Sequence, residues 1–379
     1  MSDTQTITAP AKEWIAALTR LTPAMAGRKP TPILSSIIVN PSEQTIFGFD
    51  YATSASTAIQ DASGIGDPFL VHWRWLLDAI RSTTGRARNM PVTVKMVGNK
   101  VTVSAAGYEL HTESADIGEY PSAPESLNEV EATFPAAEFR TALRRVKVAA
   151  CTDDTLPILS AVQFNIRGGN VEMFATDRYR LTTDHVAGAG EGETSFVLNA
   201  RTLKSIDRFL VGERVVLGFN SDTRWIEVVT DNVTYRTIAT DGDYPKIRSL
   251  FPEQVTASFE VDQAVLKESV KVAQFMSERF APCYISLRES GADVEFADGI
   301  FGPSKSPVAA ASLIAGDSEP IKFAMNPQYV LDALQQIGGE RVRISYTEVN
   351  KPFMFTAAGV DSAEVNVHKH LIMSVRMPS

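Results

Sequence analysis

The pattern of apolar and polar residues along the chain repeats three times. Each copy opens with a segment in which apolar residues recur every three or four positions, the spacing of one helix face. These segments cover residues 11–21, 136–150 and 262–276. Strand-like residues follow, beginning at the similar stretches PILSS (32–36), PILSA (157–161) and PCYIS (282–286), whose opening prolines are 125 residues apart in both intervals. The pattern therefore predicts one unit written three times.

A second half completes each copy. A strand, a turn and another helix are predicted at residues 67–82, 194–210 and 320–337. Alternating apolar and polar residues then return, broken at Gly, Asn and Asp as in hairpins, so each copy is expected to hold two helices and about eight strands in an α+β fold. A repeat of this length predicts a folding domain rather than a stacking motif. We expect domains at residues 1–126, 127–253 and 254–379, with the helices on one side of an arc or ring.

The bulk composition bounds the class of protein. The 379 residues are 44% hydrophobic and 21% charged, which is typical of a soluble globular chain of two or three domains. The chain shows no membrane-spanning stretch and no signal-peptide pattern, which predicts a cytoplasmic protein. Only Cys151 and Cys283 are present, too few for a disulfide framework. The net charge of −9 argues at first against a nucleic-acid partner, but it does not say where the basic residues lie.

Basic residues gather on the predicted helices. In 136–150, Phe139, Leu143 and Val146 form a core-facing stripe, while Arg and Lys recur on another face. Similar basic faces occur on most of the other predicted helices, and many acidic residues lie in the β-rich segments. The basic residues are Arg28, Arg74, Arg81, Arg140, Arg144, Lys147, Arg201, Lys204, Arg208, Lys267 and Lys271. A solvated face would explain any single helix, but the recurrence favours a lining that contacts the phosphates of enclosed duplex DNA without reading its bases.

Three motifs are specific enough to indicate a family. Residues 154–186 contain a Pro-Ile-Leu strand followed by Ala-Thr-Asp, two variable residues and Arg-Leu. Residues 241–252 read DGDYPKIRSLFP, and residues 370–377 read HLIMSVRM. On these motifs, and over essentially its full length, the chain resembles the bacterial DNA polymerase III β subunits, the sliding clamps. The resemblance implies three domains of the DNA clamp fold that form half of a ring, with no catalytic site, cofactor or metal.

The resemblance also implies a hydrophobic pocket, formed by the three motifs, that accepts short peptides from partner proteins. Its deeper part would comprise Leu159, Thr176, Leu181, Pro245, Leu250, Leu371 and Met373. Its shallower part would comprise Tyr179, Arg180, Asn326, Tyr329, Val375 and Arg376. The chain departs from the family at Arg178, where many relatives have Gly, and at Ser374, where they have Pro.

A head-to-tail homodimer is a further implication of the resemblance. The first domain of one chain would pair edge strands with the third domain of the other, which buries strand edges that would otherwise invite aggregation. Tyr108 or Leu110 is the candidate contact on the first domain, and Phe275 is the candidate on the third. The implied partners are double-stranded DNA without sequence preference, a second copy of the chain, a clamp loader, the replicative DNA polymerase and other proteins with clamp-binding peptides.

Other chemistry has weak support in the sequence. His368 and His370 stand two apart on one strand face and could be half of a metal site, but a surface pair is the more common arrangement. No Gly-rich phosphate loop or nucleophile motif is present. Two alternatives stay open beside the clamp: a specialised clamp homologue, as an extra or phage-encoded copy with an altered partner set, and a three-domain enzyme on a duplicated β-rich scaffold.

Overall fold

The computed structural model divides into two compact units. The structure describes residues 4–25, 27, 31–122, 130–153, 155–252, 254–276, 281–296, 304–316, 319–360, 364 and 366–376. Unit 1 comprises Met1–Ala137, Gly188–Thr194 and Arg201–Ala239, and unit 2 comprises Glu138–Ala187, Ser195–Ala200 and Thr240–Ser379. The second sequence copy is therefore shared between the units, and the division into three domains stays a prediction.

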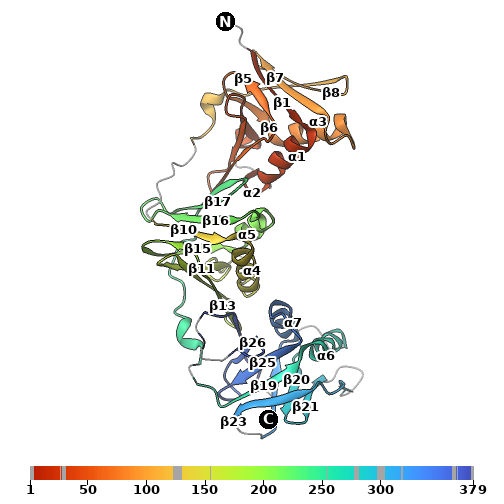
Figure 1. Cartoon of the computed structure of the whole chain (residues 1–379), viewed down its shortest axis with the longest axis vertical. Coiled ribbons are helices and arrows are strands. Elements are labelled where there is room, and N and C mark those ends of the chain that lie inside the picture. Colours follow the sequence, from red (N-terminus) through yellow and green to blue (C-terminus); the bar gives the residue numbers. More distant parts are fainter. Residues whose placement is uncertain are drawn as a thin grey trace. The chain divides into compact units, whose positions relative to one another are not determined.

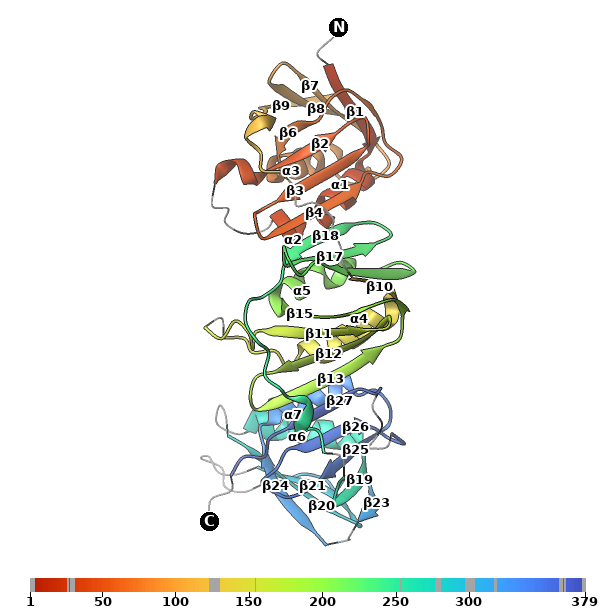
Figure 2. The same ribbon diagram turned by 90° about the vertical axis from the view of Figure 1, so that its left-hand side faces the viewer.

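Unit 1 contains two antiparallel sheets. The five-stranded sheet has the order β5 (Ser63–Ile65), β1 (Thr4–Pro10), β7 (Pro91–Val97), β8 (Lys100–Ala105) and β9 (Tyr108–Glu113). The nine-stranded sheet has the order β14 (Ala189–Gly190), β10 (Val130–Pro135), β16 (Arg214–Phe219), β17 (Trp225–Thr230), β18 (Thr234–Ile238), β4 (Thr53–Ala58), β3 (Thr45–Phe49), β2 (Ser36–Asn40) and β6 (Phe69–His72). Figure 2 shows β2, β3, β4, β18 and β17 following one another in this sheet.

Unit 2 has a second nine-stranded sheet and a four-stranded one. The larger has the order β15 (Glu193–Asn199), β11 (Ala161–Arg167), β12 (Asn170–Thr176), β13 (Arg180–Val186), β27 (Lys369–Ile372), β26 (Phe353–Ala357), β25 (Arg341–Tyr346), β19 (Ala257–Asp262) and β23 (Ala311–Gly316). The smaller has the order β22 (Ser304–Lys305), β21 (Gly291–Phe296), β20 (Cys283–Arg288) and β24 (Ile321–Met325).

The predicted helices all form, because each has one apolar face that a sheet can bury. They are α1 (Ala11–Arg20), α3 (Trp73–Thr84), α4 (Ala136–Lys147), α5 (Ala200–Ile206), α6 (Gln263–Met276) and α7 (Pro327–Gln336), with short turns at α2 (Thr22–Met25), η1 (Pro32–Ser35), η2 (Ile117–Glu119), η3 (Asp207–Phe209) and η4 (Arg248–Leu250). The stripe of Phe139, Leu143 and Val146 is buried as predicted. The expected α+β fold is thus confirmed. Within the described residues, no helix has the length and hydrophobicity needed to cross a membrane.

Helix pairs cover the sheets inside each unit. In unit 1, α1 and α3 lie side by side (Figure 1) and bury Trp14, Leu18 and Ile80. In unit 2, α6 and α7 lie side by side and contribute Leu266, Val270 and Leu334 to one core. The Asn326 side chain caps α7 by accepting from the Gln328 N–H at 2.9 Å, and Pro327 opens the first turn, where no backbone donor is required.

Strands from different sequence copies pair within each unit. In unit 1, β4 pairs with β18, with Thr53 opposite Thr237. In unit 2, β13 pairs with β27 in the same way, with Thr182 opposite His370. These pairings make each nine-stranded sheet continuous across two copies and bring the motif segments of unit 2 together.

Candidate functional site

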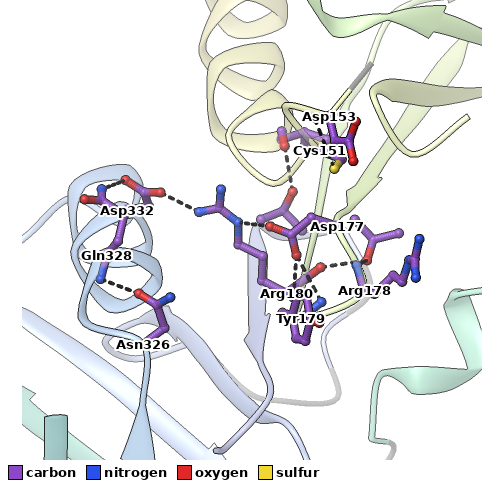
Figure 3. A network of polar contacts seen from close by, with 12 residues as sticks. Cys151, Asp153, Asp177, Arg178, Tyr179, Arg180, Asn326, Gln328 and Asp332 are labelled. Atoms are coloured by element: carbon purple, nitrogen blue, oxygen red, sulfur yellow. Dashed lines mark hydrogen bonds and ion pairs between the residues drawn. The ribbon is translucent and has the colours of Figure 1, made fainter. Parts of the chain in front are cut away.

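The turn between β12 and β13 is held by its own polar side chains. Asp177 Oδ1 accepts from the backbone N–H groups of Tyr179 and Arg180, each at 3.0 Å. Thr176 Oγ1 accepts from the Arg178 N–H at 3.1 Å and donates to the Arg180 carbonyl at 2.7 Å (Figure 3). Arg178 adopts φ 79°, in the left-handed region. The turn leaves Arg178 exposed and the Tyr179 side chain 62% exposed.

Arg180 joins this turn to α7. Its Nε donates to Asp177 Oδ2 at 2.9 Å, its Nη1 pairs with Asp332, and its guanidinium lies 4.5 Å from the centre of the Tyr329 ring. Asp332 also accepts from Gln328 Nε2 at 2.8 Å (Figure 3). Because two carboxylates neutralise the nearly buried guanidinium, Arg180 acts here as a bridge between β13 and α7.

An apolar cluster lies beside the turn. We name it the Tyr244 cluster; its buried members are Ala161, Phe174, Leu181, Val197, Tyr244, Ile247, Met354 and Leu371, with Ile158, Phe251 and Val255 packed on it. The Tyr244 hydroxyl accepts from the Thr176 N–H at 3.0 Å and donates to the Ala161 carbonyl at 3.4 Å. Burial raises the pKa of Tyr244 well above its usual range, so the hydroxyl stays protonated. It fastens the segment after residue 240 to β11 and β12.

The structure places the predicted pocket residues at three depths. Leu159, Thr176, Leu181 and Leu371 are buried. Arg180, Asn326 and Tyr329 are half-buried, while Tyr179, Pro245, Leu250, Met373, Val375 and Arg376 are exposed. The Met373 N–H donates to the Tyr179 carbonyl at 2.8 Å, and the Val375 N–H donates to the Ala324 carbonyl at 2.8 Å. The first bond lays the C-terminal segment against the turn and the second lays it against β24, and the pocket itself stays a prediction.

Sequence reasoning missed several members of this region. Tyr244 and Ile247 are apolar positions among polar ones inside the DGDYPKIRSLFP motif, a sequence signal that could have indicated them. Met354 lies in an apolar run on β26, where nothing local shows what it faces. Asp332 is a surface-type residue on a helix, and only the fold reveals its pairing with Arg180 across 152 positions.

His370 is fully buried and the His368 side chain is only 8% exposed, so the expectation of a surface pair is wrong. His370 lies on β27, which runs inside the sheet between β13 and β26, and His368 immediately precedes this strand. His368 Nδ1 lies 3.1 Å from the Thr183 carbonyl and 3.8 Å from Asp184 Oδ2. Burial lowers the pKa of His368 to about 4, against the opposing charge of Asp184. Among the described residues, no three His, Cys, Asp or Glu side chains are grouped as a metal site would require.

The residues predicted to line a DNA channel lie on helices or their ends, apart from Arg28, which falls outside the described residues. Arg74, Arg81, Arg144, Arg201, Lys204, Arg208 and Lys271 are exposed, and Arg140, Lys147 and Lys267 are half-buried. Arg74 pairs with Asp78 on its own helix at 3.0 Å, and Lys271 pairs with Glu268 on its own helix at 2.6 Å. Their role stays a prediction.

Exposed apolar residues mark the predicted dimer contacts. Phe275 on α6 is 87% exposed, and its neighbours Val272 and Met276 are also exposed. Tyr108 is 61% exposed and Leu110 half-buried on β9, the last strand of its sheet in the described part of the chain. Both surfaces suit a protein partner, and the pairing between them stays a prediction.

Unit 1 contains a counterpart of the Tyr244 cluster. In this Tyr120 cluster, Phe49, Leu70 and Tyr120 are buried, and Ile33, Ile38, Phe47 and Trp225 pack on them. The Tyr120 hydroxyl accepts from the Phe49 N–H at 3.0 Å and donates to the Ser36 carbonyl at 3.1 Å. Asp50 Oδ1 holds the following turn by accepting from Ala52 and Thr53 N–H, and Tyr51 adopts φ 71°.

Comparison with known proteins gives consistent results. Residues 133–246 match the family model of the DNA polymerase III beta subunit, central domain, and residues 248–376 match that of its C-terminal domain. The chain is 33% identical over 264 residues to a beta sliding clamp of Micrococcus luteus, covering 68% of this chain and 83% of that one. It is 28% identical over 366 residues to a beta sliding clamp of Streptomyces coelicolor, covering 93% and 94%.

A solved structure shows the same fold. The sliding clamp of Pseudomonas aeruginosa, in a structure with bound griselimycin, superposes with a TM-score of 0.88 at 17% identity, covering 98% of this chain and all of that one. At this identity the similarity concerns the fold alone.

Proposed function

The chain belongs to the family of bacterial DNA polymerase III β subunits, the DNA sliding clamps, and we propose that it tethers partner proteins to duplex DNA through the Tyr244 cluster. As a member of this family it is a processivity factor and not itself a catalyst. The proposed partners are the replicative polymerase, a clamp loader and other proteins that carry clamp-binding peptides, all in the cytoplasm.

One observation carries the assignment of the binding site. Four large side chains, Tyr179, Leu250, Met373 and Val375, are 62%, 55%, 38% and 40% exposed, and each lies within four residues along the chain of a buried member of the Tyr244 cluster. Exposed apolar groups beside a packed apolar cluster are typical of protein-binding surfaces. Leu and Phe anchors of an extended peptide would bury against them, while backbone hydrogen bonds set its direction.

We further propose that two copies close head to tail into a ring. The end strand β9 and the exposed apolar residues of α6 support this arrangement, since each offers a surface that a partner would cover. Basic residues on the helices would then contact phosphates, which gives sliding without sequence preference.

The test uses a matched pair of substitutions. Met373→Asp should weaken binding of a peptide with Leu and Phe anchors by roughly 100-fold or more, because a carboxylate would be desolvated under the peptide. Ile238→Asp is the control: Ile238 donates to the Ala52 carbonyl at 3.1 Å, as Met373 does to Tyr179, and it is 43% exposed in unit 1. This control should bind peptide as the wild type does.

Fluorescence polarisation measures the affinity, and sedimentation velocity measures the dimer, which both variants should retain. Equal binding by wild type and Met373→Asp, or no binding by the wild type, would contradict the assignment.

A further inference from the structure

The same turn position carries an unusual backbone in both units. Arg178 in unit 2 has φ 79° and Tyr51 in unit 1 has φ 71°. Each follows an Asp whose carboxylate accepts from the two backbone N–H groups beyond it. Left-handed backbone is unfavourable for residues other than Gly, and such outliers cluster at functional positions. Beside the Tyr244 cluster, the turn therefore holds a large basic residue at a position where Gly would be less strained.

The turn fixes where the Arg178 side chain projects. Its N–H donates to Thr176 Oγ1 at 3.1 Å, the following N–H, of Tyr179, donates to Asp177 Oδ1 at 3.0 Å, and the preceding one, of Asp177, donates to the Arg180 carbonyl at 3.4 Å. Thr176 is buried, and Leu181, three residues after Arg178, belongs to the Tyr244 cluster. The backbone of the turn thus sets the direction in which the Arg178 side chain leaves it, and the guanidinium points away from Arg180 (Figure 3).

The two arginines of the turn differ in charge balance. Arg180 is neutralised by Asp177 and Asp332. The Arg178 guanidinium makes no ion pair or hydrogen bond with any residue that the structure describes; the nearby exposed Asp153 feels only its charge, which helps hold the pKa of that carboxyl below its usual value after the larger effect of the Thr155 hydrogen bonds. Its charge is thus available to an incoming ligand.

We infer that Arg178 is a specificity-determining residue of the proposed peptide site and favours peptides with a carboxylate one or two residues from an apolar anchor. This inference rests on the proposed function of the Tyr244 cluster. An extended peptide advances about 3.3 Å per residue, so a side chain that close to an anchor is within reach of a guanidinium on the turn. The attraction would be that of a partly exposed ion pair, about fivefold in affinity and weaker at high salt.

The experiment crosses two peptides with four proteins. The peptides share Leu and Phe anchors and differ only by Glu or Gln at the flanking position. The proteins are the wild type, Arg178→Gly, Arg178→Glu and Tyr51→Gly, the last being the matched turn in unit 1. Gly suits a left-handed backbone, so Arg178→Gly should fold normally.

We expect the wild type and Tyr51→Gly to prefer the Glu peptide about fivefold at low salt, Arg178→Gly to bind both peptides equally, and Arg178→Glu to prefer the Gln peptide. If the wild type binds both peptides equally, or Arg178→Gly keeps the preference, the role of Arg178 is wrong while the peptide site stands. If the wild type binds neither peptide, the site and this inference both fail.

Discussion

In unit 1 a tyrosine hydroxyl joins β2 to the end of β3, and in unit 2 a tyrosine hydroxyl joins β11 to the end of β12. In each unit the next turn of the chain is held by an Asp side chain, and the strand after that turn pairs with a strand from another sequence copy. The strands beneath the clusters differ. Leu371 lies opposite Met354 in unit 2, and at the corresponding places in unit 1 Arg236 lies opposite Glu227.

The replacement of an apolar pair by a charged pair changes which ligand groups can bind at each surface. Leu371 and Met354 are 2% and 0% exposed and give the Tyr244 cluster an apolar base. Arg236 Nε pairs with Glu227 Oε2 at 2.5 Å, so the corresponding base in unit 1 is ionic. An apolar anchor over a mostly buried ion pair gains little and further desolvates the charges. The same backbone arrangement thus supports a peptide-binding site in unit 2 and only a structural contact between strands in unit 1.

The two units also differ at the residue before Leu371 in unit 2 and before Arg236 in unit 1. Tyr235 in unit 1 is buried, and its hydroxyl donates to the Arg20 carbonyl at 2.8 Å. His370 takes this place in unit 2, and neither of its ring nitrogens has a hydrogen-bond partner among the described residues. Burial, with His368 and Arg180 nearby, lowers the pKa of His370 far below its usual value. Unit 2 is therefore expected to be the acid-sensitive one.

The largest expected effect comes from breaking the ion pair of unit 1. Glu227→Met should lower the free energy of unfolding of unit 1 by about 3 kcal/mol, because it leaves the Arg236 guanidinium mostly buried without this carboxylate. Adding Arg236→Leu should restore most of that loss. All four Trp residues, at positions 14, 73, 75 and 225, belong to unit 1, so Trp fluorescence during urea unfolding reports this unit. A single variant as stable as the wild type would show that the pair does not matter.

The second largest expected effect is a difference between the units in how their free energy of unfolding depends on pH. Burial lowers the pKa of His368 from about 6.5 in the unfolded chain to about 4 in the folded one, so its contribution to the free energy of unfolding is fully present above about pH 6.5 and falls as the pH drops towards 4. At pH 5 this group alone should remove about 2 kcal/mol from unit 2. Asp184 opposes the shift and Arg145 adds to it.

Scanning calorimetry at pH 7.5 and 5.0, with Trp fluorescence as the reporter for unit 1, would measure this difference. The variant His368→Gln should flatten the dependence. An equal loss in both units, or none, would contradict the comparison.

The smallest expected effect comes from removing the tyrosine hydroxyl that joins two strands in each unit. Tyr120→Phe and Tyr244→Phe should each lower the free energy of unfolding of their own unit by about 1 kcal/mol, since each leaves a buried backbone N–H without its acceptor. Only Tyr244→Phe should also weaken peptide binding, because it loosens the segment carrying Leu250. Urea unfolding and fluorescence polarisation give the two readouts, and a peptide effect from Tyr120→Phe would break the assignment of roles.

Local patterns in the sequence determined much of this protein. The apolar spacing located the helices and their buried stripes, and three motifs indicated the clamp family, a resemblance that in turn implied the residues of the predicted pocket. Periodicity works here because a helix or strand shows in its own residues which face is apolar.

The tertiary structure alone decided what lies opposite those faces. It paired β13 with β27 and β4 with β18, which buries His370 and brings the Leu371–Met354 pair of β26 and β27 to the place that the Arg236–Glu227 pair of β17 and β18 takes in unit 1. It also neutralised Arg180 with Asp332 and left Arg178 exposed two residues earlier. A local pattern cannot show the contacts between β13 and β27, between β4 and β18, or between Arg180 and Asp332, because the chain brings these residues together from more than a hundred positions away.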